Sequence, residues 1–255
     1  MPVSRQPAPA RRPAHRRSRA GALTAAVAAL TALLAPAPAT AAPTTDERAP
    51  GYDQARCGNR SGRVLLSLDD WSYDDPERAV RVGEYLRGKG IRAAFFLIGQ
   101  YAAQQPRIAE DLRKQGHWVG NHSYSHPHLP RLSESRARQE IHDGVHSSLL
   151  RPPYGDFGPR EERLAAGLGQ RICTWTVDTL DWQTSGGVFR SPEALRASVR
   201  EAPASAKTGG VILGHLFTRF PDALPGIVAD LRDQGYRFCR NTGPTTPAIA
   251  DPLPC

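Results

Sequence analysis

The sequence predicts an α/β protein with parallel strands covered by helices, either a (β/α) barrel or a doubly wound sheet. Short apolar segments typical of buried strands alternate with amphipathic segments typical of helices over roughly 180 residues. The 255 residues, 40% of them hydrophobic, are enough for one large core. No glycine-rich phosphate-binding pattern follows the first predicted strand, which argues against a nucleotide site.

The elements are predicted from hydrophobic periodicity and from their end signals. Serine caps two of the expected helices, and glycine follows several of them. The predicted strands are 64–68, 93–98, 118–121, 149–151, 171–177, 211–213 and 236–239. The predicted helices are 76–88, 106–115, 133–142, 159–168, one opening at Ser191-Pro192, and 222–234. Strict alternation of the two kinds of element implies parallel strands.

The first 42 residues have the pattern of a secretion signal. Six arginines precede an apolar run at 20–34, and small residues offer a cleavage site near Ala42. The run is shorter than the ~20 apolar residues of a membrane span, although an uncleaved anchor is the alternative. Arg16-Arg17 leaves both general and twin-arginine export open. We expect a secreted or cell-wall-associated protein that has no membrane contact after cleavage.

The mature chain divides into three predicted parts. Residues 43–60 form a polar extension, 61–241 form the folded domain, and 242–255 form a loosely held tail rich in proline and threonine. Six of the 33 basic residues lie in the first 20 positions, which leaves 27 against 25 acidic residues. This near balance argues against nucleic-acid binding.

Four cysteines indicate an oxidising compartment. None forms a C-x-x-C pair, so a cysteine zinc site is not expected. Three pairings are possible and the sequence does not choose between them; Cys173, inside an apolar run, is alternatively a buried free thiol. Cys57, Cys239 and Cys255 lie near the ends of the mature chain, where a disulfide would fasten a terminus.

Polar residues gather just after the predicted strands. Each has an ordinary structural explanation when taken alone, such as a solvated turn or a buried histidine. In a parallel barrel, however, the carboxyl ends of all strands lie on one face, where the active site forms. The set comprises Asp69-Asp70, His122 and His126, Arg151-Pro-Pro-Tyr-Gly155, Asp178, Asp181-Trp182, and His215.

His122 and His126 are candidate metal ligands because two imidazoles four residues apart can reach one ion. A carboxylate from Asp69-Asp70 would complete a set of two histidines and one acid with open positions for water, as hydrolytic metal sites have. A structural site is the alternative, but it prefers four closed ligands and only three are evident.

Taken in order, these five motifs resemble those of the NodB-homology polysaccharide deacetylases, a carbohydrate esterase family. The resemblance covers residues 64–239 and implies a single-domain, distorted (β/α) barrel with about seven parallel strands. It assigns one divalent metal, zinc or else cobalt, to Asp70, His122 and His126. The family often has glycine after the paired aspartates, whereas this chain has Trp71, which we expect at the lip of the groove in contact with sugar.

The resemblance also implies catalytic roles. Asp69 would be the general base, Arg151 would pair with and orient a catalytic carboxylate, and the Tyr154 backbone N–H would help to hold the oxyanion. His215 would be the general acid, with its pKa raised by Asp181. Three further side chains would bind substrate: Tyr154, Trp182 and Leu213, the last two around the acetyl methyl group.

The function that the resemblance implies is removal of N-acetyl groups from N-acetylglucosamine polymers, of peptidoglycan or chitin type. One alternative is an O-acetyl esterase acting on acetylated xylan. Another is a non-catalytic carbohydrate-binding barrel, which would need neither Asp69 as a base nor His215 as an acid. We expect a polysaccharide or oligosaccharide as partner, no nucleic acid, and a monomer.

Overall fold

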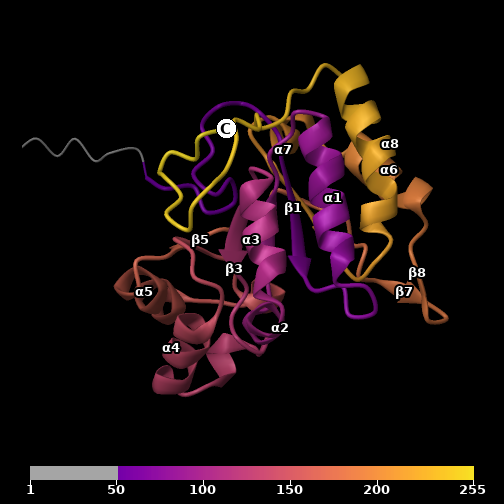
Figure 1. Ribbon diagram of the computed structural model, residues 1–255. Helices are drawn as coiled ribbons and strands as arrows, with labels where there is room; N and C mark the ends of the chain where they lie inside the picture. Colours follow the sequence, from indigo (N-terminus) through magenta and orange to yellow (C-terminus); the bar gives the residue numbers. More distant parts are fainter. Residues whose placement is uncertain (1–50) are drawn as a thin grey trace, which may run out of the picture. The chain divides into compact units, whose positions relative to one another are not determined.

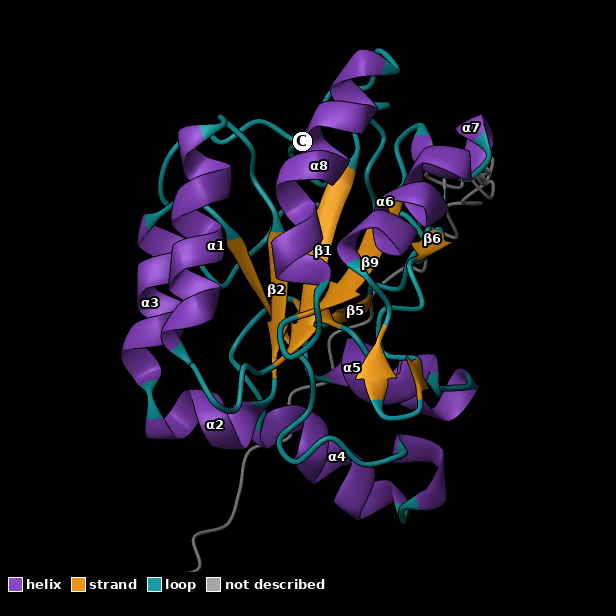
Figure 2. Ribbon diagram, turned by 90° about the vertical axis from the view of Figure 1, so that its right-hand side faces the viewer, coloured by secondary structure: helices purple, strands orange, loops and turns teal. Residues whose placement is uncertain are grey.

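A curled, seven-stranded parallel sheet forms the centre of the computed structural model, which describes residues 51–255 (Figures 1 and 2). The predicted secretion signal lies outside the described residues. Across the sheet the strands are β5 (Arg171–Ile172), β4 (Leu149–Leu150), β3 (Trp118–Asn121), β2 (Ala94–Leu97), β1 (Leu65–Asp70), β9 (Val211–His215) and β6 (Val177–Asp178). The predicted distorted α/β barrel with seven parallel strands is confirmed.

Helices cover the outer face of the sheet, and Figure 2 shows α6 and α8 next to one another in front of the strands. Their buried faces are apolar, and Arg196 of α6 pairs with Asp230 of α8 at 2.9 Å. Ser133 and Ser191 cap α4 and α6, as predicted. The helices are α1 (Glu77–Gly88), α2 (Gly99–Gln104), α3 (Pro106–Lys114), α4 (Glu134–Asp143), α5 (Pro159–Gly167), α6 (Pro192–Glu201), α7 (Ala204–Lys207) and α8 (Phe220–Asp233).

The prediction of one strand over 171–177 is wrong. The chain leaves β5 at one edge of the sheet and enters β6 at the opposite edge, and residues 173–176 cross between them. We call residues 173–176 the seam. At its two ends the seam keeps the neighbouring strand pairings: the Cys173 N–H donates to the Leu150 carbonyl of β4 at 2.8 Å, and the Thr176 N–H donates to the Val211 carbonyl of β9 at 3.0 Å. Between them, the Thr174 N–H donates to the Gln54 carbonyl at 2.8 Å, outside the sheet. The apolar run therefore spans the gap at which the barrel fails to close.

The predicted last strand, 236–239, is also wrong. After α8 the chain forms an isolated bridge between Phe238 and Val64, the residue before β1, and then turns so that Arg240 bridges Ile91 in the antiparallel sense. A small hairpin, β7 (Thr184–Ser185) and β8 (Val188–Phe189), was not predicted, nor were α2, α7 and the 3-10 turns Leu129–Arg131 and Pro153–Gly155.

Residues after 241 are packed against the domain rather than loosely held. Ile249 and Leu253 are 5% and 3% exposed, and the Leu253 N–H donates to the Gly58 carbonyl at 3.0 Å. Figure 1 shows this yellow segment beside the indigo start of the described chain. Disulfides join Cys57 to Cys173 and Cys239 to Cys255, so Cys173 is not a free thiol.

The pleat of β1 determines which side chains reach the interior of the barrel. Leu66 and Leu68 belong to the cluster packed under the helices, whereas Ser67 and Asp69 contact Arg151 inside the barrel. The strand thus delivers Asp69 to the inner face at its carboxyl end. Within residues 51–255, no helix has the length and hydrophobicity that a membrane span needs.

Candidate active site

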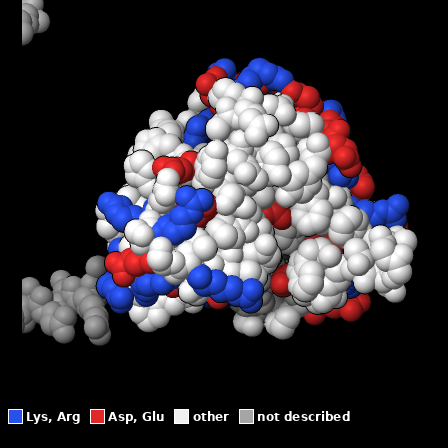
Figure 3. Space-filling model, turned by 90° about the horizontal axis from the view of Figure 1, so that it is seen from below, with Lys and Arg blue, Asp and Glu red and all other residues white. Residues whose placement is uncertain are grey.

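One cavity of about 500 Å³ opens at the carboxyl ends of the strands. Figure 3 views this end from below: the middle of the face is mostly uncharged, and acidic atoms show in its hollows. The cavity brings together residues from every motif singled out in the sequence. Its lining residues are Asp69, Asp70, Tyr73, His122, His126, Pro152, Tyr154, Gly155, Trp175, Asp178, Trp182, Leu213, His215 and Phe217.

Asp70, His122 and His126 form a group of candidate metal ligands whose donor atoms all lie within 4.8 Å of one another. The Nε2 atoms of the two histidines are 3.2 Å apart, and Asp70 Oδ1 lies 3.3 and 3.1 Å from them. Burial raises the pKa of Asp70, but its contacts with the two imidazoles outweigh burial and lower it below its usual range. Asp70 is therefore available as an anionic ligand.

Two observations show that these residues fit a divalent ion. Asp70 Oδ1 is buried and has no hydrogen-bond partner among the described residues, although such an atom normally has one. The His122 Nδ1–H donates to the Arg151 carbonyl at 2.7 Å, which leaves the Nε2 lone pair directed at the site. The donor set of two imidazoles and one carboxylate suits zinc and similar ions.

The loop that carries the histidines is shaped by local hydrogen bonds. Ser123 and His126 have left-handed backbones, with φ of 60° and 63°. The Ser123 N–H donates to Asn121 Oδ1 at 2.9 Å, and the His126 N–H donates to Ser123 Oγ at 3.0 Å. Glu140 of α4, only 2% exposed, accepts from the Ser125 N–H at 2.8 Å. These contacts allow two imidazoles separated by three residues to face the same point.

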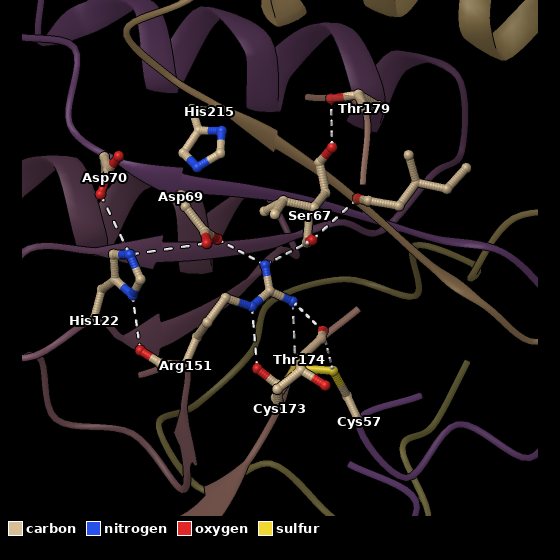
Figure 4. A network of polar contacts seen from close by, with 12 residues as sticks. Cys57, Ser67, Asp69, Asp70, His122, Arg151, Cys173, Thr174, Thr179 and His215 are labelled. Carbon is tan, nitrogen blue, oxygen red and sulfur yellow. Dashed lines mark hydrogen bonds and ion pairs between the residues drawn. A yellow bond between two sulfur atoms is a disulfide. The ribbon is translucent and has the colours of Figure 1, made fainter. Parts of the chain in front are cut away.

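Asp69 lies beside Asp70 and His122 and is held there by Arg151, as Figure 4 shows. Arg151 Nη1 donates to Asp69 Oδ1 at 2.7 Å and to Ser67 Oγ at 2.8 Å. The other carboxylate oxygen, Oδ2, lies 3.8 Å from His122 Nε2. Because neither Asp69 nor Arg151 is appreciably exposed, with values of 2% and 0%, the carboxylate has a fixed direction.

His215 lines the opposite part of the cavity and is oriented by Asp181. Its Nδ1 lies 2.8 Å from Asp181 Oδ1, and its backbone N–H donates to Asp181 Oδ2 at 2.7 Å. Thr218 Oγ1 also donates to Asp181 Oδ2. Burial lowers the pKa of His215, but the hydrogen bond and the charge of Asp181 raise it to about 9. His215 is therefore a protonated imidazole at neutral pH.

Tyr154 stands at the rim of the cavity, 58% exposed and with a left-handed φ of 62°. Its ring stacks on His128 at 3.9 Å, and its hydroxyl donates to the His126 carbonyl at 3.3 Å. This turn places Pro152, Tyr154 and Gly155 together on the cavity wall. The oxyanion role of the Tyr154 N–H stays a prediction.

Trp182 and Leu213 line the cavity, whereas Trp71 does not. Trp71 is only 3% exposed, and its ring stacks on Tyr101 of α2 at 6.0 Å. Asp70 has a left-handed φ of 71°, which turns the chain so that Trp71 joins the cluster under the helices. The expectation that Trp71 contacts sugar at the lip is therefore wrong.

The sequence reasoning missed three aromatic residues of the cavity wall: Tyr73, Trp175 and Phe217. Tyr73 is half exposed and lies edge-on to Tyr101 at 5.3 Å. The sequence held a usable signal for Tyr73, because it is an aromatic residue in the polar stretch that follows Asp69-Asp70. Trp175 was hidden inside a run interpreted as a strand, and Phe217 lies beyond the last motif.

Comparisons with known proteins point to one family. A family model described as polysaccharide deacetylase matches residues 58–173. A peptidoglycan-N-acetylglucosamine deacetylase from Bacillus cereus is 32% identical over 190 residues, which are 69% of this chain and 65% of that protein. The aligned part is 46% and 37% of two further curated relatives, so the chain spans between about one third and two thirds of their lengths.

Two solved structures share the fold. A family 4 carbohydrate esterase from Streptomyces lividans, in complex with acetate, is 30% identical, with a TM-score of 0.61, and covers 74% of this chain and 98% of its own. A family 4 pseudoenzyme from Bacillus anthracis is 26% identical, also with a TM-score of 0.61, and covers 71% of this chain and 64% of its own. Since the fold occurs in both, the side chains in the cavity have to carry any argument about activity.

Proposed function

Because this chain belongs to the NodB-homology family of polysaccharide deacetylases, we propose that it is a secreted, metal-dependent hydrolase of the N-acetyl groups of N-acetylglucosamine polymers. The observation that carries the proposal is the pairing of two fixed groups across one cavity. Asp69 is held by Arg151 on one side, and His215 is held by Asp181 on the other. A sugar-binding barrel has no need of a base and an acid in these positions.

Asp70, His122 and His126 would hold the metal, which fits their spacing and the unpartnered oxygen of Asp70. When bound, a divalent ion there supplies Lewis acidity, which polarises an acyl carbonyl and makes water easier to deprotonate. Zinc and cobalt both suit this donor set.

The chain's own groups complete the hydrolysis. Asp69 Oδ2 takes the proton of the attacking water, because Oδ1 is occupied by Arg151. The Tyr154 N–H stabilises the oxyanion that forms on the acyl oxygen. His215 Nε2 then donates a proton to the leaving nitrogen, since Nδ1 is engaged by Asp181. Trp182 and Leu213 enclose the acetyl methyl group.

The proposal is tested by measuring acetate release from N-acetylglucosamine oligomers. Removal of metal by a chelator should abolish release, and zinc or cobalt should restore it. Replacing Asp69 with Asn should lower kcat at least ~100-fold, because the general base is lost. Asp74→Asn, which neutralises an exposed aspartate five residues away, should leave kcat unchanged. Full activity in chelator would exclude the metal role, and full activity of Asp69→Asn would exclude Asp69 as base.

The second candidate function is O-deacetylation of a carbohydrate ester, favoured by the similarity to the Streptomyces lividans esterase. Both reactions use the same base and metal, but an ester leaves as an alcohol rather than an amine. Mass spectrometry of N-acetylglucosamine oligomers and acetylated xylo-oligomers, treated in parallel, separates the two. Greater kcat/KM on the xylo-oligomers would favour the esterase.

Secretion and action on the cell wall are part of the same proposal. Two disulfides within the described residues favour an oxidising compartment over the cytosol. Two of the curated relatives, from Bacillus cereus and Listeria monocytogenes, are peptidoglycan-N-acetylglucosamine deacetylases. Fractionation of cells that express the full chain should place it outside the cytoplasmic membrane.

A further inference from the structure

We propose that the disulfide between Cys57 and Cys173 is a positioning device for Asp69, acting through Arg151; the inference rests on the proposed role of Asp69 as general base. The two cysteines are 116 residues apart in sequence and join the start of the domain to the seam. Figure 4 shows the disulfide, the guanidinium and the Asp69 carboxylate in one continuous group.

The guanidinium of Arg151 is held between Asp69 on one side and the seam on the other. Arg151 Nε donates to the Cys173 carbonyl at 3.1 Å, and Nη2 donates to the Thr174 carbonyl at 2.7 Å. Nη2 also lies 3.6 Å from Cys173 Sγ, a sulfur of the disulfide itself. The opposite nitrogen, Nη1, is the one that bonds to Asp69. A planar guanidinium passes any displacement of one edge to the other.

The carbonyls that hold Arg151 belong to the part of the barrel that a sheet supports least. Cys173 and Thr174 lie between β5 and β6, at the gap between the two edges of the sheet. The Thr174 N–H bonds instead to Gln54, in the segment that Cys57 anchors. Cys57 and Cys173 are 1% and 0% exposed, so the bond is enclosed next to the group that it supports. The Cys173 N–H still bonds to Leu150 of β4 at 2.8 Å, so the disulfide fastens the seam at the point where strand pairing ends.

Base catalysis is sensitive to this arrangement because a shift of about 1 Å in a reacting group can cost roughly 100-fold in rate. The chain contains a matched control in the second disulfide. Cys239 and Cys255 are also joined and buried or half-buried, but neither lines the cavity or bonds to Arg151. If the Cys57–Cys173 disulfide only stabilised the fold, its removal would change kcat no more than removal of the Cys239–Cys255 disulfide.

The test is a double-mutant cycle between the disulfide and Arg151. Cys57→Ala/Cys173→Ala should lower kcat at least tenfold and leave KM within twofold, with bound metal unchanged. Arg151→Lys, which loses the fork that joins the seam to Asp69, should also lower kcat. The combined variant should be no more than about twofold slower than Arg151→Lys, because both changes break the same connection. Cys239→Ala/Cys255→Ala should keep the wild-type kcat. Its effect on the melting temperature should be additive with that of Arg151→Lys.

The proposal is overturned if folded Cys57→Ala/Cys173→Ala keeps its kcat, or if its rate loss multiplies with that of Arg151→Lys. If this pair of replacements prevents folding, Cys57→Ala alone, which retains Cys173 beside Arg151, goes through the same cycle with the same criteria. The melting temperatures of the wild type, the disulfide variant, Arg151→Lys and their combination provide a readout without substrate. The losses caused by the disulfide variant and by Arg151→Lys should again be non-additive. Absence of acetate release by the wild type would refute the proposed function, whereas additive melting temperatures would refute this contact.

Discussion

At the scale of single residues, the site depends on two side chains, Asp69 and His215, that buried charged partners hold in fixed directions. Arg151 places a positive charge beside Asp69, and Asp181 places a negative charge beside His215, which raises the pKa of the imidazole. A carboxylate with a cationic neighbour and an imidazole with an anionic neighbour thus share one cavity. Both partners are fully buried, at 0% exposed, so their charges are poorly screened.

Replacing Asp181 with Asn should move the alkaline limb of the activity profile to lower pH. The pKa of His215 is raised to about 9, so its proton is present at neutral pH and is lost as the pH rises through that value. Without the charge of Asp181, burial lowers this pKa, and His215 becomes neutral below its present range. We expect kcat at pH 8 to fall at least roughly tenfold, with a smaller loss at pH 6.

The measurement is the pH dependence of kcat for acetate release. Asp222→Asn, which removes an exposed carboxylate near the start of α8, is the control and should leave the profile in place. An alkaline limb that stays at its wild-type position in Asp181→Asn would show that His215 is not the acid whose proton is required.

At the scale of elements, the loop after β1 carries two aromatic residues, one in the hydrophobic core and one in the wall of the cavity. Trp71 packs under the helices, and Tyr73 lines the cavity. Trp71→Ala should lower the free energy of unfolding by about 3–5 kcal/mol, as expected for a buried tryptophan, without changing the KM of the folded fraction. Tyr73→Ala should have the reverse effect, a raised KM with stability nearly unchanged, because an exposed ring can stack on sugar.

Urea unfolding and steady-state kinetics on both variants decide the assignment. Tyr73→Phe is the control for Tyr73, because it keeps the ring and removes only the hydroxyl group. A raised KM in Trp71→Ala at full stability would restore the sequence-based placement of Trp71 at the lip.

The same loop illustrates what sequence can and cannot predict. Strand ends were predictable because apolar runs stop at polar residues, and this brought Asp69, His122 and His215 correctly to one cavity. The position of Trp71 was not, because it depends on the left-handed backbone of Asp70, which no side-chain pattern signals. The prediction of one strand over 171–177 failed for a related reason. The same apolar residue types are favoured in a buried connecting segment and in a buried strand.

At the scale of the whole molecule, the end of the domain opposite the cavity is closed by its termini. The tail crosses from Asn241 to Cys255, where the Ser148 N–H donates to the Pro247 carbonyl at 2.9 Å and Arg171 Nη2 donates to the Ile249 carbonyl at 2.6 Å. These contacts link the tail to β5 and to the residue before β4, and the Leu253–Gly58 hydrogen bond links it to the segment that carries Cys57. The contacts of the tail therefore lie at one end of the barrel and the cavity at the other, with the Cys57–Cys173 disulfide between the terminal segment and Arg151.

Deleting residues 242–255 should therefore destabilise the protein while leaving its chemistry intact. The deletion removes two buried apolar side chains, Ile249 and Leu253, and a disulfide between residues 16 apart, which alone contributes about 3 kcal/mol for a loop of this size. In urea the midpoint should fall, and kcat of the folded fraction should stay within about twofold of the wild type. Ala250→Ser, an exposed change in the same segment, should shift the midpoint by less than the equivalent of about 0.5 kcal/mol. A truncated protein with the wild-type midpoint would mean that the tail adds nothing to the fold, and a loss of kcat at full stability would mean that it reaches the cavity.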